Sequence, residues 1–383
     1  MAEQTLDGRQ RAVENLVMFG NAFHGKNVWL SGATGFKGSW LAEWLLLLGA
    51  RVHGYSLPPE TTPALFNQLQ LAGHITSEIN DIRDPSAVCK SIKAVRPDFV
   101  FHLAAQPLVR LSYEQPVETY ATNVMGTVHV MEALRELKKP CAAVLVTTDK
   151  CYENREWHRG YREEDCLGGH DPYSSSKAAA EIAIAAWRRS FFKNHPVRIA
   201  SARAGNVIGG GDWAKDRIVP DCIRALQKKQ PVPVRNPNST RPWQHVLEPL
   251  GGYLWLAASL AGRNSANSTL ESAFNFGPKR GANRTVRELV EEIIKHWPGG
   301  WTDRSNPHAV HEAKLLHLET AKALRLLKWK PVWNFSETIG QTVAWYRAAA
   351  KSPELARELL HGQISGYCAD AKTKKLLWAK TNK

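Results

Sequence analysis

Three glycines with a fixed spacing, Gly32, Gly35 and Gly38 in the run GATGFKG, place the strongest constraint on what this chain can fold into. They follow an apolar run and precede a helical pattern, the context in which this spacing is typical of a dinucleotide-binding turn. One glycine makes the tight turn, one lets the backbone approach a pyrophosphate, and one lets the helix pack on the strand. The helix N-terminus then faces the phosphates. For the glycines alone, a plain strand-turn-helix is the alternative.

Short apolar runs alternate with longer helical patterns from Asn27 onward, which is typical of β-α-β units and a parallel sheet. We expect strands at 27–31, 51–56, 75–80, 98–103, 143–147 and 197–203, and helices at 39–48, 86–95, 123–138, 174–192, 285–296 and 319–327. Gly49 is the expected C-terminal cap of the first helix. The pattern predicts an α/β fold with a Rossmann-type, doubly wound parallel sheet.

The regular alternation stops beyond Gly205, where 209–213 and 231–243 are rich in Gly, Pro, Asn and Arg. Such segments suit a smaller lobe that closes over a ligand. A later segment near 243–277 is expected to return to the first domain, with a strand at 274–276, so that the two interleave. We therefore divide the chain into an N-terminal extension at 1–24, a dinucleotide-binding domain at 25–205, and a mainly substrate-binding C-terminal lobe at 206–383. The extension shows no chemistry, and we expect a solvated or self-associating helix there.

The composition argues against several other classes of protein. Hydrophobic residues make up 43% and charged residues 22% of the 383 residues, so collagen-like, coiled-coil and disordered chains fit badly. The six cysteines form no CxxC pair, which favours a reducing compartment and argues against a metal site. The charge of +14 is spread along the chain, so we expect a small phosphate ester as partner and no nucleic acid.

No signal peptide or membrane span is visible in the sequence. The most apolar run, 40–49, is too short to cross a bilayer and contains Glu43. We therefore expect a cytoplasmic protein with no membrane partner.

Tyr173 and Lys177 occur as YSSSK inside a helical pattern, and a spacing of four puts both side chains on one helix face. The ammonium is expected to draw the pKa of the phenol down toward the working pH, so that the phenol can take a hydroxyl proton. The motif is common, and an ordinary amphipathic helix is the alternative.

Thr148, Asp149 and Lys150 follow the expected strand at 143–147, and ligand crevices in open parallel sheets lie at the carboxyl ends of strands. Together these side chains can bond a substrate hydroxyl, donate a proton and accept one. A turn in which Asp149 caps local amides is the alternative. We favour catalysis, because this element and the YSSSK helix point to the same crevice.

Longer motifs carry a family resemblance: GATGFKGSW, DIRD, FHLAAQPLVRLSYEQP, TNVMGTVHVMEAL, TTDKCYENREW, DPYSSSKAAAE, RAGNVIGGGDWAKDRIVPD and RPWQHVLEPL. Over roughly 25–345 they resemble the CDP-glucose 4,6-dehydratases, which are extended short-chain dehydrogenases/reductases. The resemblance implies a hydro-lyase that uses NAD to convert CDP-glucose to a 4-keto-6-deoxy sugar. It also implies a homodimer that pairs through the helices at 123–138 and 174–192. Ala33 departs from the histidine that is frequent in the family's loop, which puts the cofactor affinity in question.

The resemblance further implies a role for each catalytic residue. Tyr173, assisted by Thr148 and Lys177, would take the 4-hydroxyl proton while hydride passes from carbon 4 to NAD. Lys150 would then remove the proton on carbon 5 as Asp149 protonates the departing 6-hydroxyl, and hydride would return to carbon 6. Related dehydratases carry glutamate at the position of Lys150, and a lysine can act as base only if its pKa falls.

Cofactor contacts are expected from the glycine loop, the DIRD and HLAAQ runs and the catalytic elements, namely Gly32, Thr34, Gly35, Phe36, Lys37, Gly38, Asp81, Ile82, Leu103, Ala104, Ala105, Gln106, Thr147, Tyr173 and Lys177. The substrate diphosphate is expected to contact Asn206, Arg217, Arg235 and Arg241. His102 is expected to line the nicotinamide side, and Asn123 to brace the fold. Tyr55 and Ser56 stand where a ribose-binding carboxylate is usual, so this position does not distinguish NAD from NADP.

Other functions share these features. Another nucleotide-sugar 4,6-dehydratase, a 4-epimerase or a reductase would keep the glycine loop, Tyr173 and Lys177, although an epimerase needs no acid-base pair at Asp149 and Lys150. Outside enzymes, the alternative is an NAD-sensing protein without turnover. No residue identifies cytosine, so the base preference rests on the resemblance alone.

Overall fold

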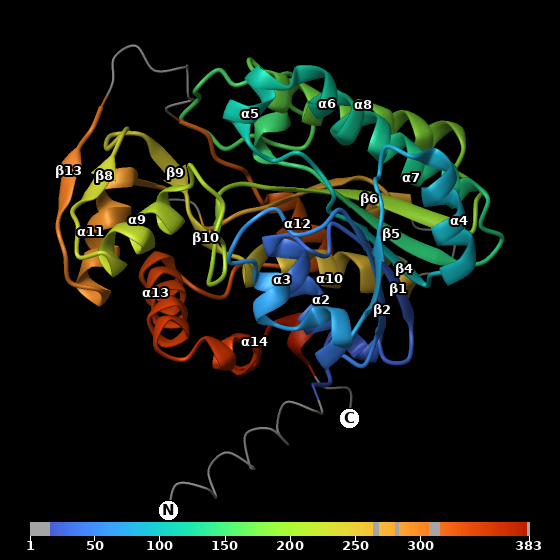
Figure 1. Ribbon diagram of the computed structural model, residues 1–383. Coiled ribbons are helices and arrows are strands. Elements are labelled where there is room, and N and C mark those ends of the chain that lie inside the picture. Colours follow the sequence, from blue (N-terminus) through green and yellow to red (C-terminus); the bar gives the residue numbers. More distant parts are fainter. Residues whose placement is uncertain (1–15, 263–267, 280–282, 306–314, 381–383) are drawn as a thin grey trace, which may run out of the picture.

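A seven-stranded parallel sheet forms the centre of the computed structural model, which describes residues 16–262, 268–279, 283–305 and 315–380 (Figure 1). The strand order is β11-β6-β5-β4-β1-β2-β3, and each neighbouring pair is parallel. The strands are β1 Asn27–Ser31, β2 Arg51–Ser56, β3 Thr76–Ile79, β4 Phe99–His102, β5 Cys141–Val146, β6 Val197–Ala204 and β11 Ala273–Phe276. The predicted Rossmann-type, doubly wound sheet is confirmed, and the expected return of 274–276 is β11, paired with β6.

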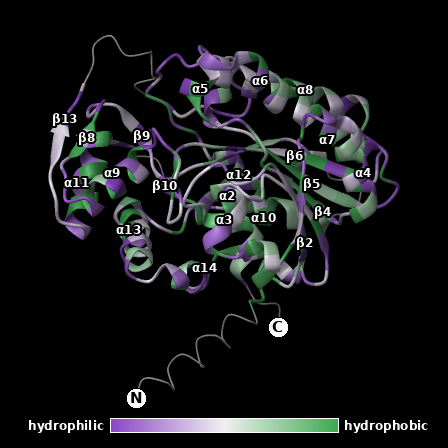
Figure 2. Ribbon diagram, viewed as in Figure 1, coloured by the Kyte–Doolittle hydropathy of each residue, from purple (hydrophilic) through white to green (hydrophobic). Residues whose placement is uncertain are grey.

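Helices cover both faces of this sheet, because alternate side chains of each strand point to opposite faces. Val28 and Leu30 of β1 belong to one hydrophobic cluster, whereas Trp29 between them belongs to the other. On the first side lie α2 Phe36–Leu47, α3 Leu65–Gln68, α10 Leu247–Ala261, α12 Ala321–Leu327 and α14 Ala356–Thr373, and on the second α4 Pro85–Val95, α7 Gly126–Arg135 and α8 Pro172–Ser190. Figure 2 shows the central strands β4 and β5 in the colour of hydrophobic residues, as expected for a sheet covered on both faces.

The expected helix at 123–138 is regular only from Gly126. It is preceded by a π-helical turn, Ala121–Met125, and by the short helices α5 Val109–Glu114 and α6 Pro116–Tyr120. Asn123 in the π turn is buried; its Oδ1 accepts from the Gln106 N–H (2.9 Å), and its Nδ2 donates to the Ser176 hydroxyl (2.9 Å). Asn123 therefore braces α8 against the loop after β4, as predicted.

A smaller lobe lies to one side of the sheet (Figure 1). It contains α9 Ile218–Gln227, α11 Val286–His296, α13 Phe335–Lys351, and the strand pairs β8 Val232–Val234 with β13 Trp301–Asp303 and β9 Thr240–Pro242 with β12 Asn283–Thr285. Two short strands, β7 Val207–Ile208 and β10 Gln244–His245, pair where the chain leaves the central sheet. The lobe therefore begins directly beyond the end of β6.

Both ends of the described chain pack on α2. Phe19 is 1% exposed, its ring stacks on Trp378 with centroids 5.1 Å apart, and it meets the edge of Trp44 of α2 at 5.7 Å. From α14, Arg357 Nε donates to the fully buried Glu43 carboxylate of α2 (2.8 Å). The expectation of a solvated or self-associating segment before β1 is wrong for 16–24, because Met18, Phe19 and Phe23 belong to the core; residues 1–15 lie outside the described residues.

No helix among the described residues is both long and apolar enough to span a bilayer.

Gly210 lies where α2, the start of the lobe and α13 meet, and it yields a test of this packing. Its carbonyl accepts the Trp40 indole N–H (3.0 Å), and a Cβ there would lie 2.2 Å from the Trp345 ring. We expect Gly210→Ala to destabilise the protein by about 1–3 kcal/mol through overpacking, seen as a lower melting temperature. Gly366→Ala on α14, where a Cβ meets nothing within 4 Å, should leave the melting temperature unchanged or raise it. Equal melting temperatures for wild type and Gly210→Ala would contradict the packing.

Candidate active site

One cavity of about 800 Å³ lies at the carboxyl ends of β1, β4, β5 and β6, between the sheet and the lobe. Every other residue predicted as a catalytic, cofactor or substrate contact lines this cavity, but His102 does not line it. His102 is 3% exposed, and its ring nitrogens contact the Ser31 hydroxyl (2.7 Å) and the Thr127 hydroxyl (3.0 Å), while burial lowers its pKa to about 3. The expectation that His102 lines the nicotinamide side is therefore wrong, because its side chain points into the packing between β1 and α7.

The glycine loop forms a cradle in which side chains have no room. Gly32 has φ +75°, and a Cβ on it would lie 2.8 Å from the Ala104 nitrogen, while a Cβ on Gly38 would lie 1.9 Å from the Gly32 oxygen. No side chain of the described residues caps α2, so its first amide groups are available to an anion. Ala33 is buried against Gly54 and does not line the cavity. The loop therefore fits the diphosphate of a dinucleotide.

The glycine cradle adjoins the end of β2, where the hydroxyls of Tyr55 and Ser56 lie. The Thr34 N–H donates to the Ser56 hydroxyl (3.4 Å), and the Tyr55 hydroxyl donates to the Asp81 carbonyl (2.9 Å). The Asp81 carboxylate is paired with Arg83 at 2.6 Å. Asp81 is thus positioned by two neighbours at the edge where the sequence predicted an adenosine contact.

Tyr173 and Lys177 lie one turn apart on α8, and both are almost fully buried. Burial raises the pKa of Tyr173 to about 12, against the opposite effect of a hydrogen bond with the Thr148 hydroxyl. Burial also lowers the pKa of Lys177 to about 8, although the charge of Glu181 acts to raise it. The expectation that Lys177 draws the tyrosine pKa down is wrong for the ligand-free protein, because the desolvation of a buried phenolate outweighs the favourable interactions.

Thr148, Asp149 and Lys150 form a tight turn directly after β5. The Thr148 hydroxyl accepts from the Lys150 N–H (3.3 Å) and donates to Asp149 Oδ1 (3.0 Å), so Thr148 and not Asp149 caps the turn. Lys150 Nζ lies 3.9 Å from Asp149 Oδ1; the side chains are 27% and 2% exposed. Asp149 Oδ2 is buried without a hydrogen-bond partner among the described residues. The turn thus presents a carboxyl group and an amine side by side to the cavity.

Glu181, which sequence reasoning missed, ties this turn to α8. Its carboxylate accepts hydrogen bonds from the hydroxyls of Thr147 (2.5 Å) and Ser201 (2.8 Å) and from Arg203 Nη2 (2.8 Å). Arg203 and Glu181 are both buried. The available sequence signals were an acidic residue one turn after Lys177 and an arginine within the apolar strand that became β6.

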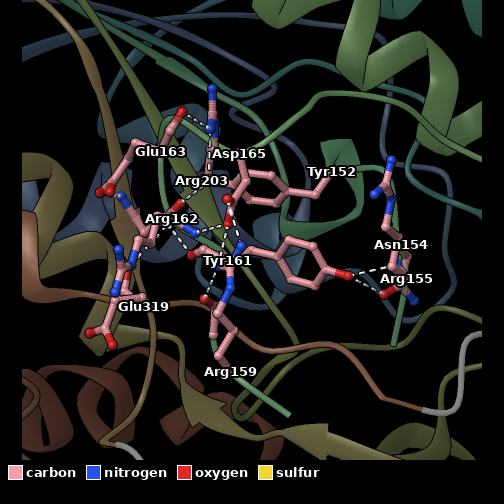
Figure 3. Close-up of polar contacts among 12 residues, drawn as sticks. Tyr152, Asn154, Arg155, Arg159, Tyr161, Arg162, Glu163, Asp165, Arg203 and Glu319 are labelled. Atoms are coloured by element: carbon pink, nitrogen blue, oxygen red, sulfur yellow. Dashed lines mark hydrogen bonds and ion pairs between the residues drawn. The ribbon is translucent and has the colours of Figure 1, made fainter. Parts of the chain in front are cut away.

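The segment after the turn is held by a second polar network (Figure 3). Arg203 Nη1 donates to the Tyr152 hydroxyl (2.7 Å), which donates to Asn275 Oδ1 of β11 (2.8 Å). Asn275 Nδ2 in turn donates to the carbonyls of Tyr161 (2.9 Å) and Glu319 (3.1 Å). The network fixes 152–161 against β6 and β11, so the turn at 148–150 is supported from both sides.

The predicted diphosphate contacts lie on the lobe side of the cavity. Arg217 is paired with Asp212 at 2.8 Å, and Arg235 with Asp216 at 2.7 Å. The sequence did not predict these aspartates, although Asp212 stands in the GGGDW run. Arg241 and Asn206 also line the cavity, and Asn206 Oδ1 is buried without a hydrogen-bond partner among the described residues.

Lys37 lies between the cofactor loop and the catalytic groups. Its pKa is lowered to about 8, first by burial and then by the charge of Arg217, while Asp149 acts to raise it. Its ammonium is therefore near Asp149 and Arg217 as well as in the glycine loop.

The buried ammonium of Lys177 should cost stability in the ligand-free protein. A pKa of about 8 against 10.5 in water corresponds to a destabilisation of about 3 kcal/mol at pH 7. Between pH 8 and 10.5 the folded state binds fewer protons than the unfolded state, so this cost falls as the pH rises. We expect Lys177→Met to raise the melting temperature at pH 7, with a difference that shrinks toward pH 10. Lys351→Met, at an exposed site, is the control; a pH-independent difference for Lys177→Met would contradict the assignment.

Known proteins resemble this chain over most of its length. A family model described as GDP-mannose 4,6 dehydratase matches residues 30–342. A CDP-glucose 4,6-dehydratase of Salmonella typhimurium is 47% identical over 342 residues, which cover 88% of this chain and 94% of the relative. A dTDP-glucose 4,6-dehydratase of Streptomyces antibioticus is 28% identical and covers 84% of this chain and 92% of its own length.

Solved structures share the fold. The dTDP-glucose 4,6-dehydratase DesIV of Streptomyces venezuelae, solved with NAD bound, superposes with a TM-score of 0.72 at 22% identity, covering 85% of this chain and 99% of its own. A UDP-glucose 4-epimerase of Thermotoga maritima gives a TM-score of 0.71 at 21% identity, with the same coverages. Because one is a dehydratase and the other an epimerase, the fold alone does not separate the two reactions. Given the family model and the relative of 47% identity, the chain belongs to the GDP-mannose 4,6 dehydratase family of extended short-chain dehydrogenases/reductases.

Proposed function

We propose that the protein is an NAD-dependent CDP-glucose 4,6-dehydratase, a hydro-lyase that converts CDP-glucose to CDP-4-keto-6-deoxyglucose and water. The observation that carries the proposal is that the Asp149 and Lys150 pair lines the same cavity as Tyr173, Lys177 and the glycine cradle. A 4-epimerase needs only Tyr173, Lys177 and the glycine cradle, whereas the loss of water also needs an acid and a base for the elimination. The relative of 47% identity, named a CDP-glucose 4,6-dehydratase, supports the choice of nucleotide.

The residues of the cradle fit NAD. The α2 amides and the bare Cα atoms of Gly32 and Gly38 would hold its diphosphate, Asp81 and Ile82 its adenosine, and Leu103 to Gln106, with Thr147, its nicotinamide side. When bound, NAD would supply a hydride acceptor for carbon 4 and a hydride donor for carbon 6.

Tyr173 serves as the base of the oxidation. It takes the proton of the 4-hydroxyl as the electron pair of the C4–H bond leaves as hydride, which makes carbon 4 a ketone. Because the pKa of Tyr173 is about 12 in the ligand-free protein, the phenolate needs support from Lys177, Arg217 and the Thr148 hydroxyl. Burial in a site that excludes water makes each of these interactions stronger.

Lys150 and Asp149 serve as the base and the acid of the elimination. The ketone acidifies the proton on carbon 5, and neutral Lys150 takes it. The C5–H electron pair forms the C5=C6 double bond, the C6–O bond breaks, and protonated Asp149 gives its proton to the departing oxygen, which leaves as water. Lys150 then returns the proton to carbon 5 as carbon 6 is reduced.

One proton shift prepares this pair for the reaction. The ion pair becomes a neutral amine and a carboxylic acid when a proton moves from Lys150 to Asp149, 3.9 Å away. Exclusion of water by the substrate favours the neutral pair, because two charges lose more solvation than two neutral groups. Lys150 can then act as the base in its neutral form, and no second base is needed to deprotonate it.

The substrate diphosphate binds on the lobe side of the cavity through Arg217, Arg235, Arg241 and Asn206. Arg217 and Arg235, which pair with Asp212 and Asp216, line the cavity, and a guanidinium can bond two phosphate oxygens at once. We therefore assign the nucleotide sugar to this side and NAD to the domain at 25–205.

We also propose a homodimer in a reducing, cytoplasmic setting. Large apolar side chains are exposed along α6, the π turn and α8, namely Val117 (73%), Tyr120 (40%), Met125 (47%), Ile182 (58%) and Phe191 (41%). Large exposed apolar side chains on neighbouring helices are typical of a protein interface. All six cysteines are free thiols, which supports the reducing compartment.

The test of function is a panel of CDP-, dTDP-, GDP- and UDP-glucose with NAD, followed by mass spectrometry of the product. We expect CDP-glucose to lose one water and to be converted at least tenfold faster than the other three. Tyr173→Phe should lower kcat by about 10²- to 10⁴-fold. A product of unchanged mass would identify an epimerase, and NAD binding without turnover of any nucleotide sugar would identify a sensor.

The dimer is tested by one charged substitution on the proposed interface. We expect wild type to sediment as a dimer and Ile182→Asp as a monomer at micromolar concentration, because an unpaired carboxylate in an apolar interface is costly. Leu324→Asp on α12, where the native side chain is 50% exposed, should remain a dimer. A wild type that sediments as a monomer, or an Ile182→Asp dimer, would contradict the assigned face.

A further inference from the structure

Gly205 and Asp149 stand side by side at the tips of neighbouring strands. Asp149 follows β5 and Gly205 follows β6, and the two strands pair in parallel with Val146 opposite Ala202. A Cβ built on Gly205 would lie 2.7 Å from Asp149 Oδ2, 3.4 Å from Asp149 Cγ and 3.3 Å from Pro242 Cγ. The space that a side chain at 205 would fill is therefore taken by the carboxyl group of Asp149.

The backbone does not explain why a glycine stands here. Gly205 is not among the described glycines with positive φ, in contrast to Gly32 and Gly211. Any L-residue can adopt its conformation. Space is therefore the property that only glycine supplies at 205.

The carboxyl group of Asp149 is fixed on one side only. Its Oδ1 accepts from the Thr148 hydroxyl (3.0 Å) and lies 3.9 Å from Lys150 Nζ. Its Oδ2 has no hydrogen-bond partner among the described residues and is buried against Gly205. The bare Cα of Gly205 thus sets how far the carboxyl group can withdraw from the cavity.

We propose that Gly205 is a positioning residue whose missing side chain allows the elimination step while leaving the oxidation step unaffected. The proposal rests on the acid role of Asp149 in the function proposed above. An ordinary contact begins at 3.4 Å, so a methyl group at 205 must displace the carboxyl oxygen by roughly 0.7 Å. Catalytic groups tolerate about 0.5 Å, and a displacement near 1 Å costs on the order of 100-fold in rate.

The base of the oxidation step lies on a different element from Asp149, and Thr148, which assists that base from the same turn as Asp149, contributes none of the three atoms nearest to the added Cβ. Tyr173 and Lys177 belong to α8, and the three atoms nearest to the added Cβ belong to Asp149 and Pro242. Gly205→Ala should therefore separate two steps that take place in one cavity.

The experiment uses the full-length enzyme with NAD and two substrates. CDP-glucose reports the whole reaction through the 4-keto-6-deoxy product. CDP-6-deoxyglucose, which lacks the leaving hydroxyl, reports the oxidation alone through the absorbance of NADH in a single turnover. For Gly205→Ala we expect product formation from CDP-glucose to fall 10- to 100-fold and the single-turnover oxidation of CDP-6-deoxyglucose to stay within twofold of wild type.

A double-mutant cycle tests whether Gly205 acts through Asp149. Asp149→Asn should lower the elimination, and adding Gly205→Ala to it should lower it no further, because the displaced group no longer donates a proton. Gly366→Ala, at a site with open space, is the matched control and should behave as wild type. Additive losses in the double variant, or equal losses of oxidation and elimination in Gly205→Ala, would overturn the proposal.

A crystal structure separates this inference from the proposed function. Asp149 in its wild-type position in Gly205→Ala would overturn the inference, whatever substrate the enzyme takes, whereas a wild type that removes no water from CDP-glucose would overturn the function. If Gly205→Ala fails to fold, the Gly205→Ala, Pro242→Ala double variant replaces it, because removing Pro242 Cγ relieves part of the crowding and leaves the 2.7 Å approach to Asp149 Oδ2. In that variant the elimination is expected to fall while the oxidation stays within twofold of wild type, and equal losses of both steps would count against the proposal.

Discussion

The buried carboxylate of Glu181 connects the three elements on which the active site depends. It lies on α8 one turn after Lys177, and it accepts hydrogen bonds from Thr147 at the tip of β5 and from Ser201 and Arg203 on β6. Burial alone would raise its pKa, but the charge and hydrogen bonds of Arg203 outweigh burial and lower it. Removing either member of such a pair leaves an uncompensated buried charge, which typically costs about 3–5 kcal/mol. The helix with the oxidation pair and the strand tips are therefore held in one arrangement.

Around this connection, the two chemical tasks are assigned to different elements. Tyr173, the proposed base of the oxidation, and Lys177 lie on α8, whereas the proposed elimination residues and Thr148 lie on the turn after β5. Because α8 packs against this turn, both sets line one cavity. This separation means that packing around a strand tip, as at Gly205, can alter one set without moving the other. The aspartates of the lobe add a third set, because they pair with arginines that we propose to bind the diphosphate.

Local patterns in the sequence predicted most of the fold, and the residues that they indicated for the site line the cavity with the exception of His102. The glycine spacing, the YSSSK helix and the residues after β5 are each contained within a few positions, so their geometry follows from one turn or one helix face. The pairing of Glu181 with Arg203, or of Asn275 with Tyr152, joins residues 22 and 123 positions apart. No periodicity indicates such a pair, because it depends on which strands become neighbours.

The errors have the same physical origin. His102 was expected in the cavity, but alternate side chains of β4 point to opposite faces of the sheet, and the His102 side chain points between β1 and α7. The pKa of Tyr173 depends mainly on burial by surrounding elements. The spacing between Tyr173 and Lys177 carries no information about that burial. Phe19 ends the apolar run 16–19, but its partner Trp378 lies near the other end of the chain, so the local sequence does not show what the run packs against.

Contact between the two chain ends and α2 also determines the order in which a ribosome can complete this protein. Trp44 is synthesised 334 residues before Trp378, which packs on it edge to face. At roughly 5–20 residues per second, translation of that interval takes about 20–70 s. During this time the helix that begins in the glycine loop lacks the apolar cover that Trp378 supplies. The half of the enzyme that is made first is therefore finished last.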